Sequence, residues 1–469
     1  MFKTMDKWKR SVAAFLMLVC VLTAMPLPVQ AEDYWPEGPE ISCASAIVME
    51  VNTGTVLYEK KSHKVRYPAS ITKIMTTLLA IENCDMNEIV TFSADAVYKN
   101  EGDTSNIARD LGEEMTVEQC LYAVMLESAN ECAYAVAEHV GQKLGGDYST
   151  FIDLMNSRAE ELGCTNTHFN NCNGLPDEEH WTSAYDMALI SAAAYQNETF
   201  RIITGSESYN IPPTNKHTDP TYCHNHHAMI YPWKGETRFL WDNVTGGKTG
   251  YTTVAKSTLV TYAEKDGLTL VCVVMQGDSP NHYMDTRALL DYCFDNFQAL
   301  NISENETSLA EENLGDTGVL NDNGSFVTLD ANAYIVMPKA SAFSDAAFEQ
   351  SEVQGDTGTL AQLQYTYADR VVGKATIVTT GAKVEEKYFK KEQPEEAADD
   401  VRVVVIRPEW IGLGILAIAL VVLCIYFGKK LYDNYYVIRH NREVRKARRD
   451  RFKTTERKKR YRKRDRMFK

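Results

Sequence analysis

Residues 68–73 (PASITK) combine a hydroxyl and an amine at a spacing that suits nucleophilic catalysis. Ser70 and Lys73 are three residues apart, so on a helix they share a face and the amine can reach the hydroxyl. The amino end of such a helix carries partial positive charge, and the amide of Ser70 can donate to an oxyanion formed there. A lysine whose pKa is lowered by burial can act as the base. The segment is a candidate for acyl transfer, and the alternative is an ordinary amphipathic helix with a capping serine.

Residues 128–130 (SAN) form a second polar candidate. A stretch with helical character, 116–126, precedes them and predicts that they lie on a short connection between helices. There Ser128 could relay a proton and Asn130 could hold a substrate amide. The pattern Ser-x-Asn is not specific by itself, because it also occurs at residues 208–210, 279–281 and 303–305.

Residues 246–250 (GGKTG) are the third candidate and invite comparison with a phosphate-binding loop. That loop requires a further glycine where this chain has Asp242, and the pattern predicts that a strand, not a helix, follows. We therefore exclude nucleotide binding. At the edge of a sheet, Lys248 and Thr249 could face a ligand carboxylate, while the glycines allow a substrate backbone to approach.

The elements that must position these residues predict an α+β fold. Alternating and apolar runs predict strands, and apolar residues from Ile71 to Leu79 follow helical periodicity. Helices lying between a first hairpin and later strands indicate an antiparallel sheet with a helical cluster, which we place in a catalytic domain over 40–300. The expected strands are 46–50, 56–58, 257–262 and 268–275, and the further expected helices are 116–126 and 131–139.

A second folded region is expected after the catalytic domain. Short β-rich runs separated by Asn-Gly, Asp-Thr-Gly and Gly-Lys turns predict a small all-β domain over 304–390. An acidic stretch then favours a linker over 391–409.

Both ends of the chain predict export and membrane attachment. Residues 1–31 have the basic start, apolar core and small residues of a signal peptide. Residues 410–427 form an uncharged apolar run long enough for one C-terminal transmembrane helix. The tail, 428–469, carries a net +14 and belongs on the cytoplasmic side by the positive-inside rule. The chain as a whole carries −15, so residues 32–427 are strongly acidic, which makes nucleic-acid binding by the main domain improbable.

The cysteines predict neither a disulfide framework nor a zinc site. Eleven are present, of which nine lie outside the predicted signal and span, and there is no paired CxxC pattern. Residues 223–227 (CHNHH) invite comparison with a metal site, but adjacent side chains seldom converge on one ion, so we expect a hydrogen-bonded loop. We therefore expect mostly buried thiols, no metal and no cofactor.

Taken together, the three candidates occur in the order SxxK, SxN and KTG, 58 and 120 residues apart. In this the chain resembles the penicillin-recognising serine D,D-peptidases and serine β-lactamases. It is most similar to the low-molecular-mass penicillin-binding proteins that are D-alanyl-D-alanine carboxypeptidases. Further similar stretches are 46–50 (AIVME), 161–169 (ELGCTNTHF), 173–177 (NGLPD) and 182–188 (TSAYDMA).

The resemblance implies a β-lactamase/transpeptidase-like fold and a serine carboxypeptidase that removes the terminal D-alanine from peptidoglycan stem peptides. It implies that Ser70 forms an acyl-enzyme with Lys73 as base, that Ser128 passes the proton to the leaving amine, and that β-lactams inhibit by acylating Ser70. It also implies that the amides of Ser70 and Tyr251 form an oxyanion hole. The residues expected to bind substrate are Asn130, Lys248, Thr249, Gly250 and Tyr251.

Two departures and two alternatives accompany the resemblance. Ala129 stands where such carboxypeptidases usually have glycine, so its methyl could narrow the loop, and a full span replaces the more usual amphipathic anchor. A class A β-lactamase would need a Glu-x-x-Leu-Asn arrangement, which is not found at Glu161. A membrane-anchored receptor for β-lactams or muropeptides, without turnover, is the other alternative.

Overall fold

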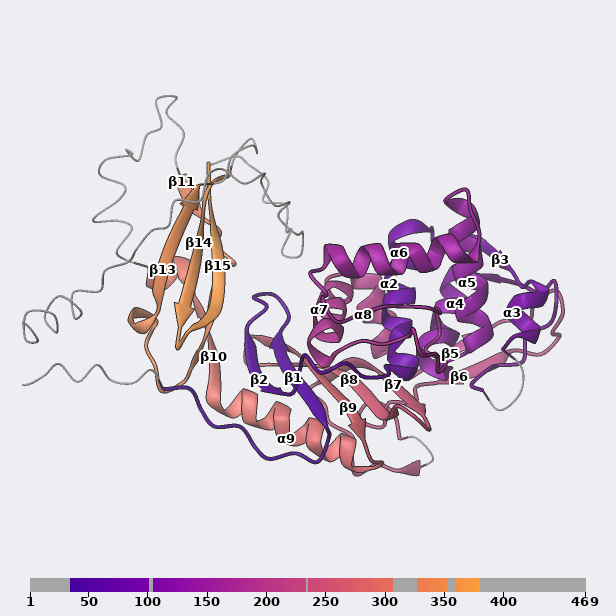
Figure 1. The fold of residues 1–469 in the computed structure, drawn as a ribbon, viewed down its shortest axis with the longest axis horizontal. Helices are drawn as coiled ribbons and strands as arrows, with labels where there is room; N and C mark the ends of the chain where they lie inside the picture. Colours follow the sequence, from indigo (N-terminus) through magenta and orange to yellow (C-terminus); the bar gives the residue numbers. More distant parts are fainter. Residues whose placement is uncertain (1–33, 101–103, 233–234, 307–326, 353–358, 380–469) are drawn as a thin grey trace, which may run out of the picture. The chain divides into compact units, whose positions relative to one another are not determined.

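The computed structural model describes residues 34–100, 104–232, 235–306, 327–352 and 359–379 (Figure 1). The predicted signal peptide, linker, span and basic tail lie outside these residues. Within them, no helix combines the length and apolar character that crossing a membrane requires.

The centre of the catalytic region is a five-stranded antiparallel sheet with the strand order β2-β1-β9-β8-β7. Strands β1 and β2 form a hairpin around the turn at 51–55, and β7, β8 and β9 follow one another as an antiparallel meander. The two hairpins predicted from the sequence, β1–β2 and β8–β9, are therefore confirmed. Strand β7 lies at one edge of the sheet and pairs with β8 from Val244 to Thr252. The strands are β1 (Ser45–Glu50), β2 (Val56–Lys60), β7 (Val244–Thr252), β8 (Lys256–Lys265) and β9 (Leu268–Gly277).

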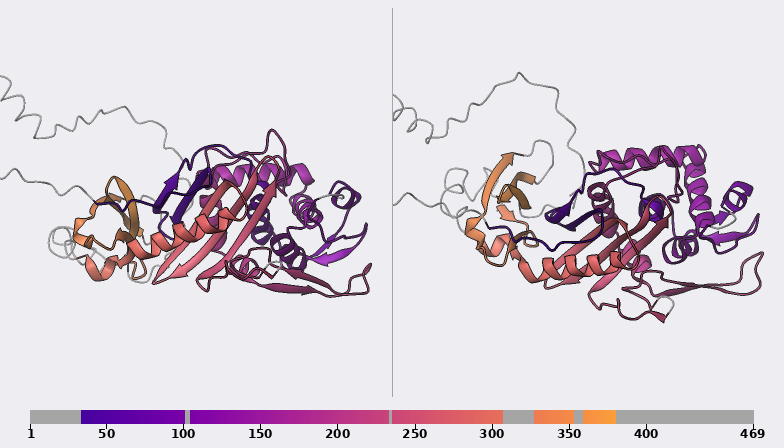
Figure 2. Two further views of the ribbon diagram at one scale, coloured as in Figure 1. Left: turned by 90° about the horizontal axis from the view of Figure 1, so that it is seen from below. Right: turned by 60° about the horizontal axis from the view of Figure 1, so that its bottom comes forward.

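Apolar side chains are buried on both faces of this sheet, which explains why β1 and β9 are almost continuously apolar. Along β1, Ile47 belongs to the core shared with helix α7 (Ala184–Tyr195), whereas Val48 faces helix α9 (Asn281–Asn296). Figures 1 and 2 show α9 lying across one face of the sheet and the helical cluster covering the other. The predicted α+β class is therefore confirmed.

The helical cluster is larger than the sequence patterns predict. The expected helix over 116–126 ends as an α-helix at Tyr122, and a π-helical turn (Ala123–Glu127) replaces its last part. The helices after residue 143 were not predicted from the sequence. The helices are α2 (Lys73–Asn83), α3 (Ala94–Tyr98), α4 (Val117–Tyr122), α5 (Asn130–Lys143), α6 (Tyr148–Glu161), α7, α8 (Glu198–Gly205), α9 and α10 (Ile302–Asn305).

Two short ribbons flank the helical cluster, and a separate β-rich part follows the catalytic region. The ribbons pair β3 (Ile89–Thr91) with β4 (Glu114–Thr116), and β5 (Ser208–Ile211) with β6 (Thr221–His224). The β-rich part contains a β10–β12 pair and a four-stranded antiparallel sheet ordered β11-β15-β14-β13, with its own apolar core. Its strands are β10 (Phe297–Asn301), β11 (Val327–Leu329), β12 (Tyr334–Pro338), β13 (Ala347–Glu352), β14 (Thr359–Tyr367) and β15 (Arg370–Thr379).

Candidate active site

Ser70 lies on a tight 3-10 turn, Ala69–Thr72, that leads directly into α2. The preceding residue, Ala69, has a left-handed backbone with φ +53°, a conformation that costs about 1 kcal/mol or more for a residue with a side chain. Neighbouring groups hold this backbone in place: the Thr258 hydroxyl donates to the Pro68 carbonyl over 2.8 Å, and the Thr72 hydroxyl donates to the Ala69 carbonyl over 2.9 Å. The turn thus presents a half-buried Ser70 in a fixed, strained geometry.

Lys73 is fully buried, and its amine contacts the Ser70 hydroxyl and two oxygen atoms that can orient it as a base. Its Nζ lies 3.1 Å from the Ser70 hydroxyl, 2.7 Å from Asn130 Oδ1 and 2.7 Å from the backbone carbonyl of Asn173. Burial lowers the pKa of this amine to about 7. A neutral amine has two N–H groups and one lone pair, and the two carbonyl oxygens can only accept. They therefore take both N–H groups, which leaves the lone pair for the proton of Ser70.

The second candidate is tied to the first by the bond between Asn130 and Lys73. Asn130 is the first residue of α5, and its backbone N–H donates to the Ser105 carbonyl over 2.9 Å. Since Oδ1 is engaged by Lys73, Nδ2 is the side-chain atom that can meet a substrate carbonyl. Ser128 adopts a left-handed conformation with φ +61°, and its hydroxyl is buried without a hydrogen-bond partner in the structure as described.

Ala129 lies in this connection, where its methyl could narrow the loop. Ala129 has an extended backbone with φ −60°, so it does not need the conformational freedom of glycine. Its side chain is fully buried in the main apolar core. The left-handed position falls on Ser128 instead.

The third candidate was expected to lie just before a strand. It lies within strand β7 instead. Lys248 is buried, and its Nζ donates to the Thr249 carbonyl over 2.9 Å. Burial, with a smaller contribution from the charge of Lys73, lowers the pKa of Lys248 well below its ordinary value. The first and third candidates lie in one site, because Gly250, two residues after Lys248, is packed against the backbone of Ser70.

The backbone of β7 turns alternate residues towards its open edge. The N–H and C=O of Gly247 bond the Thr204 hydroxyl, at 3.0 and 2.8 Å, and not the neighbouring strand β8. Because strand periodicity is two and the register runs regularly from Gly247 onwards, Thr249 and Tyr251 share this orientation. Their amides and carbonyls therefore point away from β8, where an extended ligand could meet them, although the Thr249 carbonyl already accepts from Lys248 Nζ.

Gly250 brings this edge next to the nucleophile. A Cβ at Gly250 would lie 2.8 Å from the Ser70 amide nitrogen and 2.4 Å from the Thr258 hydroxyl, so the backbones approach more closely than any side chain allows. The amides of Ser70 and of Tyr251, the next residue along β7, are thereby brought near each other. Two convergent amides are what an oxyanion hole needs.

Sequence reasoning missed the role of residues 173–180, which contact the turn that carries Ser70 and the amine of Lys73. Besides the Asn173 carbonyl, this segment provides Gly174, where a Cβ would lie 1.9 Å from the Ala69 carbonyl and where φ is +85°. His180 Nε2 lies 2.9 Å from the Thr72 hydroxyl, and burial lowers the pKa of this imidazole to about 4, so it is neutral. The stretch 173–177 was singled out only as similar to a family, and nothing in it indicated which atoms face the site.

The histidine-rich stretch 223–227 makes separate hydrogen bonds, as predicted, but its first two residues end strand β6 and do not lie in a loop. The His226 ring and the His224 amide bond opposite oxygens of Glu127, at 2.9 and 2.7 Å, and the His227 ring bonds the Thr261 hydroxyl at 2.9 Å. The nine cysteines that the structure describes are all free thiols, and seven of them are buried.

The lowered pKa of Lys73 predicts a pH dependence of acylation. Because only the neutral amine accepts the proton of Ser70, the second-order rate constant for acylation should rise with pH through about 7 and then level off. Well below the midpoint it should fall about tenfold per pH unit. A fluorescent penicillin, followed at several pH values, measures this directly. A rate constant that is flat from acid to alkaline pH would contradict the assignment of Lys73 as the base.

Replacing Gly250 by alanine should separate the oxyanion amides. The added methyl meets the Ser70 amide and Thr258, so β7 must shift and one oxyanion donor is misplaced. We expect acylation to slow by about 10²-fold, the scale for losing one such donor. Gly54→Ala is the control, since it adds strain at φ +71° in an open turn and should lower stability without slowing acylation. Equal rates in Gly250→Ala and wild type would show that the close approach is not needed.

Comparison with known proteins identifies a family and several relatives of this chain. The family model for D-alanyl-D-alanine carboxypeptidases matches residues 32–279. The chain is similar to D-alanyl-D-alanine carboxypeptidase DacF of Bacillus subtilis, with 33% identity over 298 residues that cover 62% of this chain and 72% of the relative. Among solved structures it is similar to the Streptomyces K15 DD-transpeptidase, with 28% identity, a TM-score of 0.50 and coverage of 55% of this chain and 100% of that one. Penicillin-binding protein 5 from Haemophilus influenzae shares the fold, with a TM-score of 0.57 and 22% identity over 73% of this chain and 98% of that one.

Proposed function

This chain belongs to the D-alanyl-D-alanine carboxypeptidase family, and from that premise we propose how its own residues carry out the reaction. It is a serine D,D-carboxypeptidase of the low-molecular-mass penicillin-binding class. Its substrate is the peptidoglycan stem peptide, from which it removes the terminal D-alanine. The observation that carries the proposed roles is the set of three bonds at Lys73, which join Ser70, Asn130 and Asn173.

In the first step, Ser70 Oγ attacks the carbonyl carbon between the two D-alanines while Lys73 takes the hydroxyl proton. The amides of Ser70 and Tyr251 stabilise the developing oxyanion. The C–N bond then breaks, and Lys73 passes its proton through the Ser128 hydroxyl to the leaving amine, which returns Lys73 to its neutral form. Among the described residues, that hydroxyl has no other hydrogen-bond partner and is available for this transfer. The products are free D-alanine and an ester on Ser70.

In the second step, water attacks the ester and Lys73 again serves as the base. Lys73 then returns the proton to Ser70 Oγ, which restores the free enzyme. With a β-lactam only the first step, acylation of Ser70, is efficient. Its ring opens without releasing a leaving group from the site.

Substrate orientation comes from the open edge of β7 and from Asn130. The stem peptide lies along Thr249 and Tyr251 as an added strand, and Asn130 Nδ2 donates to a peptide carbonyl. Lys248 and the Thr249 hydroxyl meet the terminal carboxylate. The arriving carboxylate favours the charged form of Lys248, so substrate binding reverses the effect of burial at this amine.

The test of this function is release of D-alanine by the full-length protein from a peptide ending in D-Ala-D-Ala. Release should be absent with the same peptide ending in L-Ala-L-Ala and after preincubation with penicillin. Addition of an amine acceptor distinguishes transfer to water from transfer to another peptide. A protein that is acylated by penicillin but releases no D-alanine would be a receptor, and rapid hydrolysis of the penicillin adduct would indicate a β-lactamase.

We further propose that residues 1–31 direct export, that 410–427 cross the membrane once and that 428–469 remain inside. The supporting observations are the apolar run and the charge of the tail. Protease added to intact cells stripped of their wall should degrade the catalytic domain and spare an epitope in the tail.

A further inference from the structure

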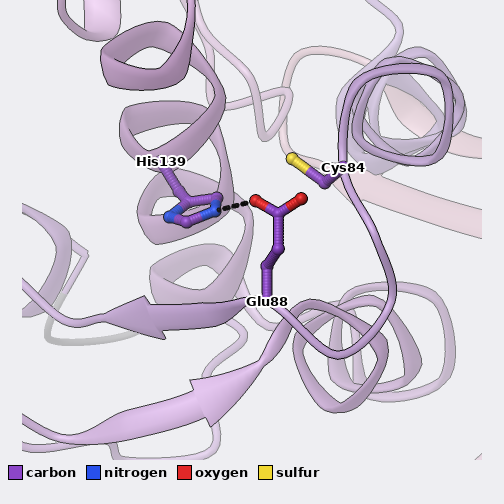
Figure 3. Close-up of side chains that lie close together, drawn as sticks. All are labelled: Cys84, Glu88 and His139. Carbon is purple, nitrogen blue, oxygen red and sulfur yellow. Dashed lines mark hydrogen bonds and ion pairs between the residues drawn. The ribbon is translucent and has the colours of Figure 1, made fainter.

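Three side chains with different metal-binding atoms meet near the carboxyl end of α2, the end opposite to Lys73. Cys84 follows α2, Glu88 lies on the connection to β3, and His139 lies on α5. Their sulfur, carboxylate and imidazole donor atoms all lie within 4.8 Å of one another. Figure 3 shows the three side chains pointing towards a common centre.

We propose that Cys84, Glu88 and His139 bind a zinc ion, with water as the fourth ligand. A thiolate, an imidazole and a carboxylate together match the preferences of Zn²⁺, whereas Mg²⁺ and Ca²⁺ take oxygen ligands. Bond lengths of about 2.0–2.3 Å place the ligand atoms of a tetrahedral zinc roughly 3.3–3.8 Å apart. The 3.0 Å separation of His139 Nε2 and Glu88 Oε2 is already close to this, so small side-chain rotations suffice.

The second oxygen of Glu88 is held by groups outside the cluster. Oε1 accepts from the Asp85 amide over 2.7 Å and from Lys143 Nζ over 2.5 Å. These bonds fix the carboxylate so that Oε2 faces His139 and Cys84. Such support of a ligating carboxylate is typical of metal sites.

The local charges favour a dication. Glu88 and the exposed Asp85 contribute two negative charges, and Lys143 offsets one of them. Cys84 adds a further negative charge only when a bound metal displaces its thiol proton. The carboxyl end of α2 lies at Cys84 and adds partial negative charge. The donor side chains are accessible, since those of Glu88 and His139 are about one quarter exposed, so an ion can enter from solvent.

The site would clamp the two helices that present the catalytic groups. Helix α2 begins at Lys73 and ends beside Cys84, and α5 begins at Asn130 and carries His139 nine residues later. The ion is therefore about 15 Å from the reacting atoms and acts on stability, not on chemistry. This inference does not depend on the proposed function.

The test uses the full chain, freed of metal by a chelator and titrated with Zn²⁺ against a chromogenic chelator. We expect one zinc per chain, a higher melting temperature with zinc, and a loss of affinity of at least about 100-fold in Cys84→Ser and in His139→Gln, more than an outer-shell change causes. Cobalt should show a sulfur-to-metal charge-transfer band in the wild type that Cys84→Ser lacks. Cys164→Ser is the matched control, because Cys164 is the other half-buried thiol among the residues that the structure describes.

Penicillin labelling shows whether each variant is folded, since the cluster is remote from Ser70. If Cys84→Ser does not fold, Glu88→Gln replaces it in the same titration. Zinc affinity that is equal in wild type and a folded variant, or cobalt spectra without a sulfur band, would overturn the proposal.

Discussion

Ser70→Ala should abolish both the release of D-alanine and labelling by penicillin. The variant lacks the oxygen to which the acyl group is attached, so no residual base or oxyanion hole can restore the covalent route. We expect turnover to fall by at least about 10⁴-fold, the scale on which enzymes of this kind respond to loss of the nucleophile. Release of D-alanine is measured by mass spectrometry, and labelling by a fluorescent penicillin.

The fold of Ser70→Ala should be nearly intact. Within the described part of the chain, the half-buried hydroxyl bonds only Lys73, and losing that bond costs about 0.5–1.5 kcal/mol of unfolding free energy. Ser303→Ala is a suitable control, because Ser303 is an exposed serine of another Ser-x-Asn pattern. A Ser70→Ala protein that still accepts penicillin would place the nucleophile elsewhere.

Lys73→Met should leave the nucleophile in place but remove its base. We expect acylation by penicillin to slow by about 10³-fold, within the range for loss of general-base catalysis. Raising the pH should not restore the rate as it does in the wild type, because the group that titrates near 7 is gone. The measurement is the acylation rate constant over a range of pH.

This substitution also tests the structural role of the lysine. Methionine keeps most of the volume but leaves Asn130 Oδ1 and the Asn173 carbonyl without their donor, at a cost of about 1–3 kcal/mol each. The melting temperature should therefore fall, while exposed Lys99→Met should change neither rate nor stability by much. Acylation of a folded Lys73→Met protein within tenfold of the wild-type rate would show that another group serves as the base.

The local parts of the site could be predicted from the sequence. Ser70 and Lys73 are one helical turn apart, so their contact follows from helix geometry alone. The strand pairs β1–β2 and β8–β9 are joined by short turns, and their apolar runs determine their register. The order and spacing of the three motifs then favoured one family.

The environment of these residues was decided by tertiary structure. The amine of Lys73 is oriented by the hydrogen bonds that it donates to Asn130 and Asn173, which lie 57 and 100 residues away in the chain. The open orientation of β7 follows from a contact with Thr204, and the nearness of Gly250 to Ser70 follows from packing between segments 180 residues apart. No local pattern encodes such contacts, because they form only when the core brings the segments together.

The burial of the two site lysines could not be predicted from the sequence. By type, Lys73 and Lys248 are residues that almost always remain exposed, and nothing next to them in the sequence marks them as buried. Only the packed cluster and the edge of the sheet remove water from their amines and lower the pKa of each. The sequence by itself determined which groups can react and in what order they occur, whereas the tertiary structure decided their ionisation and orientation, because desolvation and hydrogen bonding depend on neighbours that are distant in the chain.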